Sequence, residues 1–139
     1  MVRALALMTG EPYRQLYNEL TCAAYTHARL HGKAWDFRGI EKKGLYKEVF
    51  HPVYRSFGLV RVKLPSGPRP TFKEATAQYG RCIIETKNHA VYADRTGVYD
   101  TWDSRRVHGT GGGAGYTDRK ALRIWIPGPD MATVMGGVR

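Results

Sequence analysis

The sequence predicts a single α+β domain in which N-terminal helices pack on a C-terminal antiparallel β-sheet. In residues 1–58 the apolar side chains recur every three or four positions, whereas residues 59–126 contain alternating runs separated by turns. The chain has 139 residues, 42% of them hydrophobic, which matches one domain that buries its own core. We therefore expect one domain over residues 1–126 and a flexible Gly/Pro tail over residues 127–139.

Three helices are expected in the first part of the chain, over residues 2–8, 12–31 and 45–56. Gly10 is typical of a residue that ends the first helix, and the charged segment 33–44 is expected to be an exposed loop. The second helix carries a stripe of apolar side chains that should be buried, namely Tyr13, Leu16, Tyr17, Leu20, Ala23 and Ala24.

The second part of the chain predicts the sheet. A short helix over residues 72–78, with Thr71 as its N-cap, interrupts the strands. Residues 94–97 form a tight turn between two of the strands. The runs that alternate or are rich in β-branched residues are 59–64, 81–86, 89–93, 98–102 and 122–126.

The charge of the chain indicates an anionic partner. Lys and Arg number 22 against 12 Asp and Glu, a formal net charge of +10. Such an excess attracts an acidic protein surface or a nucleic acid. We favour a protein partner and keep nucleic acid as the alternative. Two basic faces are expected to bind it: one flanks the glycine loop, with Arg105, Arg106, Arg119, Lys120 and Arg123, and the other lies on the third helix or the loop before it, with Lys42, Lys43 and Lys47. The apolar run near the N-terminus is too short for a signal peptide or a membrane span, so we expect neither.

The spacing of the cysteines and histidines indicates neither a disulfide framework nor a metal site. Cys22 and Cys82 lie in different predicted elements without CxxC spacing, which suits a reducing compartment and excludes a disulfide framework. His27 and His31 are four residues apart on one helix face, but no third ligand accompanies them. We expect no metal and no cofactor.

His89 and Asp100 form the candidate site. His89 lies five residues before Asp94, and Asp100 lies three residues after Gly97. In an antiparallel hairpin these two side chains can approach each other on one face. A carboxylate beside an imidazole fixes its tautomer and orients the ring, as a general base in nucleophilic catalysis requires. A structural His–Asp hydrogen bond is the alternative.

The chain contains several motifs in the same order as in a family of small phage-encoded proteins, which it therefore resembles. These are the papain-like cysteine peptidases of the bacteriocin-processing-peptidase type. The motifs are the Arg-Ala-Leu-Ala run at residues 3–6 followed by Gly10, a Pro-Tyr helix start, the Gly-Arg strand that leads from residue 80 to His89, and Tyr-Asp-Thr at residues 99–101. The resemblance covers about residues 1–108.

The resemblance implies a papain-like fold and a Cys–His–Asp site, with His89 as the base and Asp100 as the acid that orients it. The family's cysteine is expected one or two residues before Val2, where this chain has Met1, so the nucleophile is missing. We therefore expect a catalytically degenerate domain that serves as a structural or binding protein in the virion or the host cytoplasm, with phage or host proteins as partners. The alternative is an active thiol peptidase that uses Cys22, Cys82 or a cysteine preceding Met1.

Overall fold

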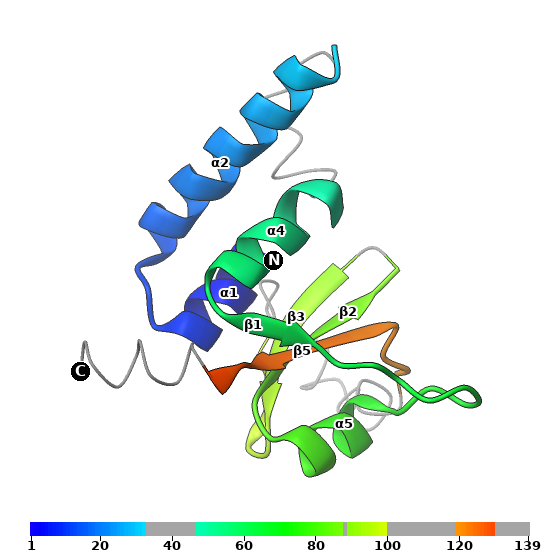
Figure 1. Cartoon of the computed structure of the whole chain (residues 1–139). Coiled ribbons are helices and arrows are strands. Elements are labelled where there is room, and N and C mark those ends of the chain that lie inside the picture. The colour runs from blue at the N-terminus through cyan, green and yellow to red at the C-terminus, as the bar shows by residue number, and fades with distance from the viewer. Residues whose placement is uncertain (33–46, 88, 100–118, 130–139) are drawn as a thin grey trace.

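The computed structural model of the chain describes residues 1–32, 47–87, 89–99 and 119–129. In this part of the chain, helices precede and flank a five-stranded antiparallel sheet (Figure 1), which confirms the predicted α+β class. The elements are α1 (Val2–Thr9), α2 (Tyr13–Leu30), α4 (Lys47–Ser56), β1 (Leu59–Arg61), α5 (Phe72–Tyr79), β2 (Cys82–Thr86), β3 (His89–Asp94), β4 (Gly97–Tyr99) and β5 (Arg123–Pro127).

The strands lie in the order β1-β5-β2-β3-β4, so the described strand that comes last in the sequence lies inside the sheet. All of the pairings are antiparallel, and the β3–β4 hairpin turns at the predicted residues, with Asp94 opposite Gly97. The β1 ladder is shorter than the predicted strand 59–64, although the Val62 N–H still donates to the Ile124 carbonyl at 2.9 Å.

Strand β5 runs one residue beyond the predicted strand 122–126, so the first residue of the expected tail is part of the sheet. Next to it, the Gly128 N–H donates to the Gly58 carbonyl at 2.9 Å. A Cβ at Gly128 would lie 2.8 Å from that carbonyl oxygen and 2.7 Å from a methyl carbon of Val60. The two backbones approach this closely because Gly128 has no side chain.

Both faces of the sheet are covered. Helices α1 and α4 lie on one face with α2 packed outside them, and α5 lies on the other face (Figure 1). Strand β5 serves both cores, because Trp125 and Ile124 point to opposite faces and each has an exposed fraction of 0%. The larger core contains Leu5, Met8, Leu16, Leu20, Phe50, Tyr54, Ile83 and Trp125, and the smaller contains Phe72, Ala75, Cys82, Ile84, Val91 and Ile124.

Helix α2 buries a narrower stripe than the sequence predicts. Its buried side chains are Leu16, Leu20, Ala24 and Ala28, which recur every four residues and face α1 and α4. The prediction for Tyr13 is wrong, since 52% of this residue is exposed. Tyr13 is the first residue of α2 and lies beyond that stripe, where its ring stacks on Tyr17 with centroids 6.3 Å apart.

The predicted N-cap of α5 is a complete capping box. The Glu74 N–H donates to Thr71 Oγ1 and the Thr71 N–H donates to Glu74 Oε1, both at 3.1 Å. These hydrogen bonds lower the pKa of the Glu74 carboxyl, the backbone bond at Thr71 having the larger effect.

Replacing Thr71 with alanine is expected to destabilise the protein by about 1 kcal/mol, because the Glu74 N–H loses its acceptor. Urea unfolding followed by circular dichroism measures the change. Thr71→Ser is the control and should retain most of the stability, since serine offers the same acceptor. Equal losses in the two variants would contradict a role for the hydroxyl group.

Candidate functional site

The described residues test only half of the predicted His89–Asp100 pair. His89 is partly exposed at the start of β3, opposite Thr86, and its backbone carbonyl accepts a bond from Thr86 Oγ1 at 3.4 Å. The last described pair of the β3–β4 ladder is Tyr92 with Tyr99, and Asp100 lies outside the described residues. The approach of these two side chains therefore stays a prediction.

Neither cysteine of the chain has the surroundings of an activated nucleophile. Cys82 lies in β2 with an exposed fraction of 0%, and burial together with the negative charge of Asp94 raises the pKa of its thiol to about 12. Such a thiol carries almost no thiolate at neutral pH. Cys22 is exposed in the interior of α2, away from the helix N-terminus that could activate it.

A buried polar cluster joins α4 to the sheet. His51 on α4 and Glu85 on β2 have exposed fractions of 7% and 2%. The Nε2 atom of His51 lies 3.0 Å from both carboxylate oxygens of Glu85. It is the donor, because a carboxylate oxygen has only lone pairs to offer. The Trp125 indole N–H on β5 donates to Glu85 Oε2 at 2.6 Å.

Cations lie on the solvent side of this cluster. The Arg123 guanidinium lies 4.0 Å from Glu85 Oε1, and the guanidinium carbon of Arg55 lies 5.4 Å from the centre of the Trp125 ring. Tyr54 lies deeper, with a hydroxyl that finds no hydrogen-bond partner among the described residues. Burial first, and the charge of Glu85 second, raise the pKa of Tyr54 well above its ordinary value.

The sequence analysis did not identify the His51–Glu85 pair, although each residue carries a local signal. His51 falls between Phe50 and Tyr54 on the apolar stripe of its helix, and Glu85 alternates with Ile83 on the core side of β2. A titratable residue on a buried stripe indicates a partner. No local spacing identifies that partner, because His51 and Glu85 are 34 residues apart.

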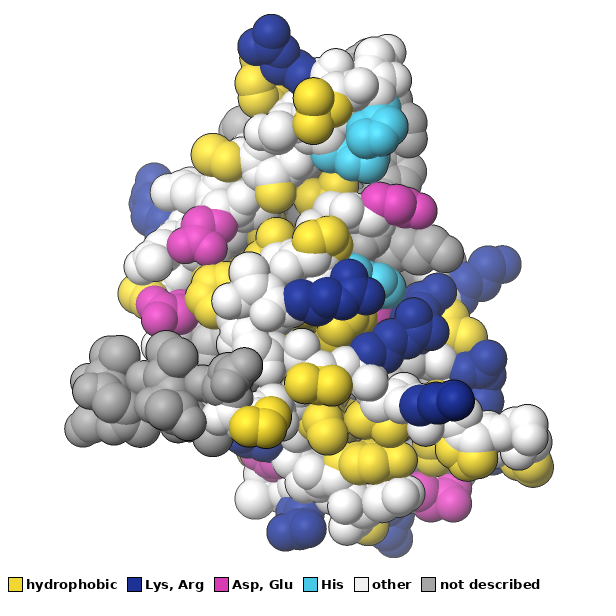
Figure 2. Space-filling model, in the orientation of Figure 1, with side chains coloured by type: hydrophobic (Ala, Val, Ile, Leu, Met, Phe, Trp, Pro, Cys, Tyr) yellow, Lys and Arg dark blue, Asp and Glu magenta, His cyan; other side chains and the backbone are white. Residues whose placement is uncertain are grey.

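A cationic groove opens beside this cluster, at the edge of the sheet. It encloses about 570 Å³ and is lined by the segment from Arg61 to Gly67, by Arg69, and by Leu122 and Arg123. Four of these side chains are cationic, namely Arg61, Lys63, Arg69 and Arg123, and none of the described lining residues is acidic. Figure 2 shows Lys and Arg side chains gathered on this face of the molecule, over α4, β1 and β5.

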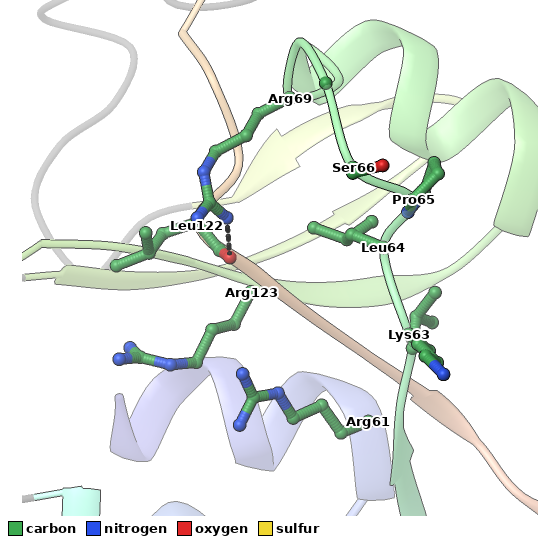
Figure 3. A pocket seen from close by; sticks show the side chains of 10 residues that line it. Arg61, Lys63, Leu64, Pro65, Ser66, Arg69, Leu122 and Arg123 are labelled. Carbon is green, nitrogen blue, oxygen red and sulfur yellow. Dashed lines mark hydrogen bonds between the residues drawn. The ribbon is translucent and has the colours of Figure 1, made fainter.

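One side chain in the lining of the groove is tethered across it. Arg69 leaves the turn that follows Lys63, and its Nη1 donates to the Leu122 carbonyl at 2.6 Å (Figure 3). Arg61 and Arg123 extend in the same direction from the adjacent strands β1 and β5 (Figure 3). Three guanidinium groups and one ammonium group thus line one hollow, an arrangement that suits an anionic ligand.

The groove differs in part from the basic faces that the sequence indicated. Arg123 was expected in one of them, and it lines the groove. Arg119 and Lys120 are exposed nearby in the chain. Lys47 is the first residue of α4 and does not line the groove. Lys42, Lys43, Arg105 and Arg106 lie outside the described residues, and the groove instead contains Arg61, Lys63 and Arg69.

The described residues hold no group of three His, Cys, Asp or Glu side chains that could bind a metal ion. His27 and His31 stack with ring centroids 4.1 Å apart, and His31 Nδ1 bonds the His27 carbonyl at 2.9 Å. None of the described helices has the length and apolar composition needed to cross a bilayer.

Comparisons with protein-family models, curated proteins and solved structures found no match to this chain.

Replacing Glu85 with alanine is expected to destabilise the protein by about 3 kcal/mol, because the Trp125 indole N–H and the His51 ring would be left buried without their acceptor. Glu85→Gln is the control and should cost less, since its amide oxygen still accepts one of the two bonds. Denaturant unfolding measures both variants. A loss below 1 kcal/mol for Glu85→Ala would contradict the role of the buried cluster.

Thiol labelling should separate the two cysteines. In the folded protein at pH 8, a maleimide reagent is expected to modify Cys22 and to leave Cys82 intact, because the Cys82 thiol is buried and has its pKa raised to about 12. Mass spectrometry counts the adducts, and a Cys22→Ser variant isolates Cys82. Fast modification of Cys82 in that folded variant, lost on His89→Ala, would restore a thiol nucleophile.

Proposed function

We propose that this chain is a papain-like domain that binds an acidic protein through its cationic groove. In this proposal it is a structural or binding component of a phage, either in the virion or on a host protein, and not a peptidase. The observation that carries the proposal is that Arg61, Lys63, Arg69 and Arg123 line one hollow in which no described lining residue is acidic.

The fold class is compatible with this assignment. The family that the sequence resembles combines N-terminal helices with an antiparallel sheet, and α1 and α4 cover one face of such a sheet here. The assignment to that family rests on the sequence motifs from residue 3 to residue 101.

The thiol peptidase alternative receives no support from the cysteines of this chain. Catalysis of that type needs a thiolate within reach of a general base. Cys82 is buried with a raised pKa, and Cys22 lies on an outer helix that packs on α1 and α4. A binding role does not require a reactive thiol at either cysteine.

The lining of the groove favours a protein over a nucleic acid. Proteins that bind single-stranded nucleic acid stack the bases on aromatic side chains, and none of the described residues that line this groove is aromatic. Its lining alternates cations with apolar side chains, which include Val62, Leu64 and Leu122. A peptide with both acidic and apolar side chains matches such a lining better than a phosphate backbone does.

Binding of the whole chain to fluorescent poly-L-glutamate tests the proposal. We expect saturable binding that weakens with salt and falls about tenfold in Arg61→Ser/Lys63→Ser, since two exposed ion pairs contribute together about 1.4 kcal/mol. The control Arg14→Ser/Arg95→Ser removes the same charge from exposed positions in α2 and in the β3–β4 turn, and should change affinity less than twofold.

Two outcomes would contradict the proposal. Equal losses in the two double variants would show that net charge alone attracts the polymer, without a site in the groove. Tighter, length-dependent binding to duplex DNA, with a salt slope of about −0.9 per neutralised phosphate, would make nucleic acid the partner.

A further inference from the structure

Strand β1 is an edge of the described sheet, and its pairing with β5 fixes which backbone groups face outward. The Val62 N–H bonds the Ile124 carbonyl and the Gly58 carbonyl accepts from Gly128, both at 2.9 Å. Hydrogen bonding alternates along an antiparallel strand, so the even-numbered residues bond toward β5. The N–H and C=O groups of Leu59, Arg61 and Lys63 therefore point away from β5, toward the open edge.

The side chains along this edge alternate in chemistry. Arg61 pairs with Trp125, so it lies on the same face of the sheet as Arg123 of β5, and the two side chains extend in one direction (Figure 3). Lys63 follows the end of β1 and also lines the groove. Val60 extends from the other face and is 48% exposed. One face of the edge is therefore cationic, and the other offers an apolar contact.

We propose that the acidic partner binds as an added β-strand along this edge. Its backbone bonds the outward groups of Leu59, Arg61 and Lys63, and its acidic side chains, at every second position, face the cations of the groove. Apolar side chains at the alternate positions contact Val60. This inference rests on the proposed function, which supplies the acidic partner, and it adds the conformation and the residue pattern of the bound segment.

The ends of the edge limit the length of the added strand. Pro65 has no N–H, and by the same alternation its N–H would have been the next outward donor. Before Leu59, the next odd-numbered residue is Phe57, whose N–H already donates to the Val53 carbonyl of α4 at 3.2 Å. Strand β1 itself has three residues and the Val62 N–H bond extends its pairing with β5 by one, so the edge offers backbone partners to a short strand.

The charges on the edge also disfavour pairing with a second copy of the chain. An unprotected edge strand tends to pair with another copy of itself. Two β1 edges brought together would place Arg61 and Lys63 of one copy beside those of the other, and like charges across a strand pair are unfavourable. An acidic strand would place opposite charges across the pair, which is favourable. The residues that disfavour self-association therefore also favour an acidic partner.

The test uses end-capped heptapeptides with the sequence Val-Glu-Val-Glu-Val-Glu-Val and the whole chain, with affinity measured by calorimetry. Two analogues carry N-methyl groups, either on the three glutamates or on the two internal valines. Both keep the charge, but each removes the N–H groups of one edge of the added strand. We expect the parent to bind, one analogue to lose at least tenfold, and the other to stay within threefold.

Hydrogen exchange provides a second readout. The amides of Leu59, Arg61 and Lys63 should exchange more slowly in the complex with the parent peptide, while that of Val62, already bonded to Ile124, should change little. Arg61→Ser/Lys63→Ser should abolish this protection, and Arg14→Ser/Arg95→Ser should preserve it.

The outcomes separate the two proposals. If poly-L-glutamate binds through the groove but both analogues bind like the parent, or no heptapeptide binds, strand addition is wrong and the binding function stands. If neither the polymer nor the heptapeptides bind in a manner that depends on Arg61 and Lys63, the proposed function falls as well.

Discussion

A carboxylate inside a protein must be surrounded by donors, and the carboxylate of Glu85 imposes this requirement on the rest of the structure. Its donors come from two different elements, His51 on α4 and Trp125 on β5. Helix α4 can satisfy it only in one position across the sheet, and β5 only in the register that places Trp125 opposite Ile83. Apolar packing alone would tolerate small shifts of either element, whereas a hydrogen bond of 2.6 Å tolerates very little.

The same carboxylate connects the interior to the groove. Arg123 is paired with Glu85 in the β2–β5 ladder, and its guanidinium serves both the buried cluster and the lining of the hollow. Part of its charge is balanced from inside, so Arg61, Lys63 and Arg69 supply most of the field that reaches solvent. One wall of the groove is consequently attached to the core through Arg123.

Sequence periodicity predicted most helices and strands, because their caps, turns and ends depend on residues that are close in the sequence. The helix that Thr71 caps, the turn at residues 94–97 and the stop at Gly10 each depend on neighbours within a few positions. The candidate site was harder. Glu85 meets partners from residues 51 and 125, and Arg61 meets Arg123 only because β5 inserts beside β1. Spacing along the chain carries no signal for such contacts. Tyr13 shows a second limit: it belongs to the regular apolar stripe predicted for its helix, yet it is exposed, because the stripe does not indicate how far the packing partners extend along the helix.

The position of β5 has a consequence for the order in which the molecule is assembled. Hairpins β2–β3 and β3–β4 can form from neighbouring sequence, but β1 has no described strand to join until β5 has been synthesised about sixty residues later and has settled between β1 and β2. A nascent chain that stops before Arg123 can pack α1 on the β2–β3 hairpin, but it lacks the strand that joins β1 to β2. Folding to the native sheet is therefore a late, all-or-none event, and the cationic edge exists only in molecules that have completed it.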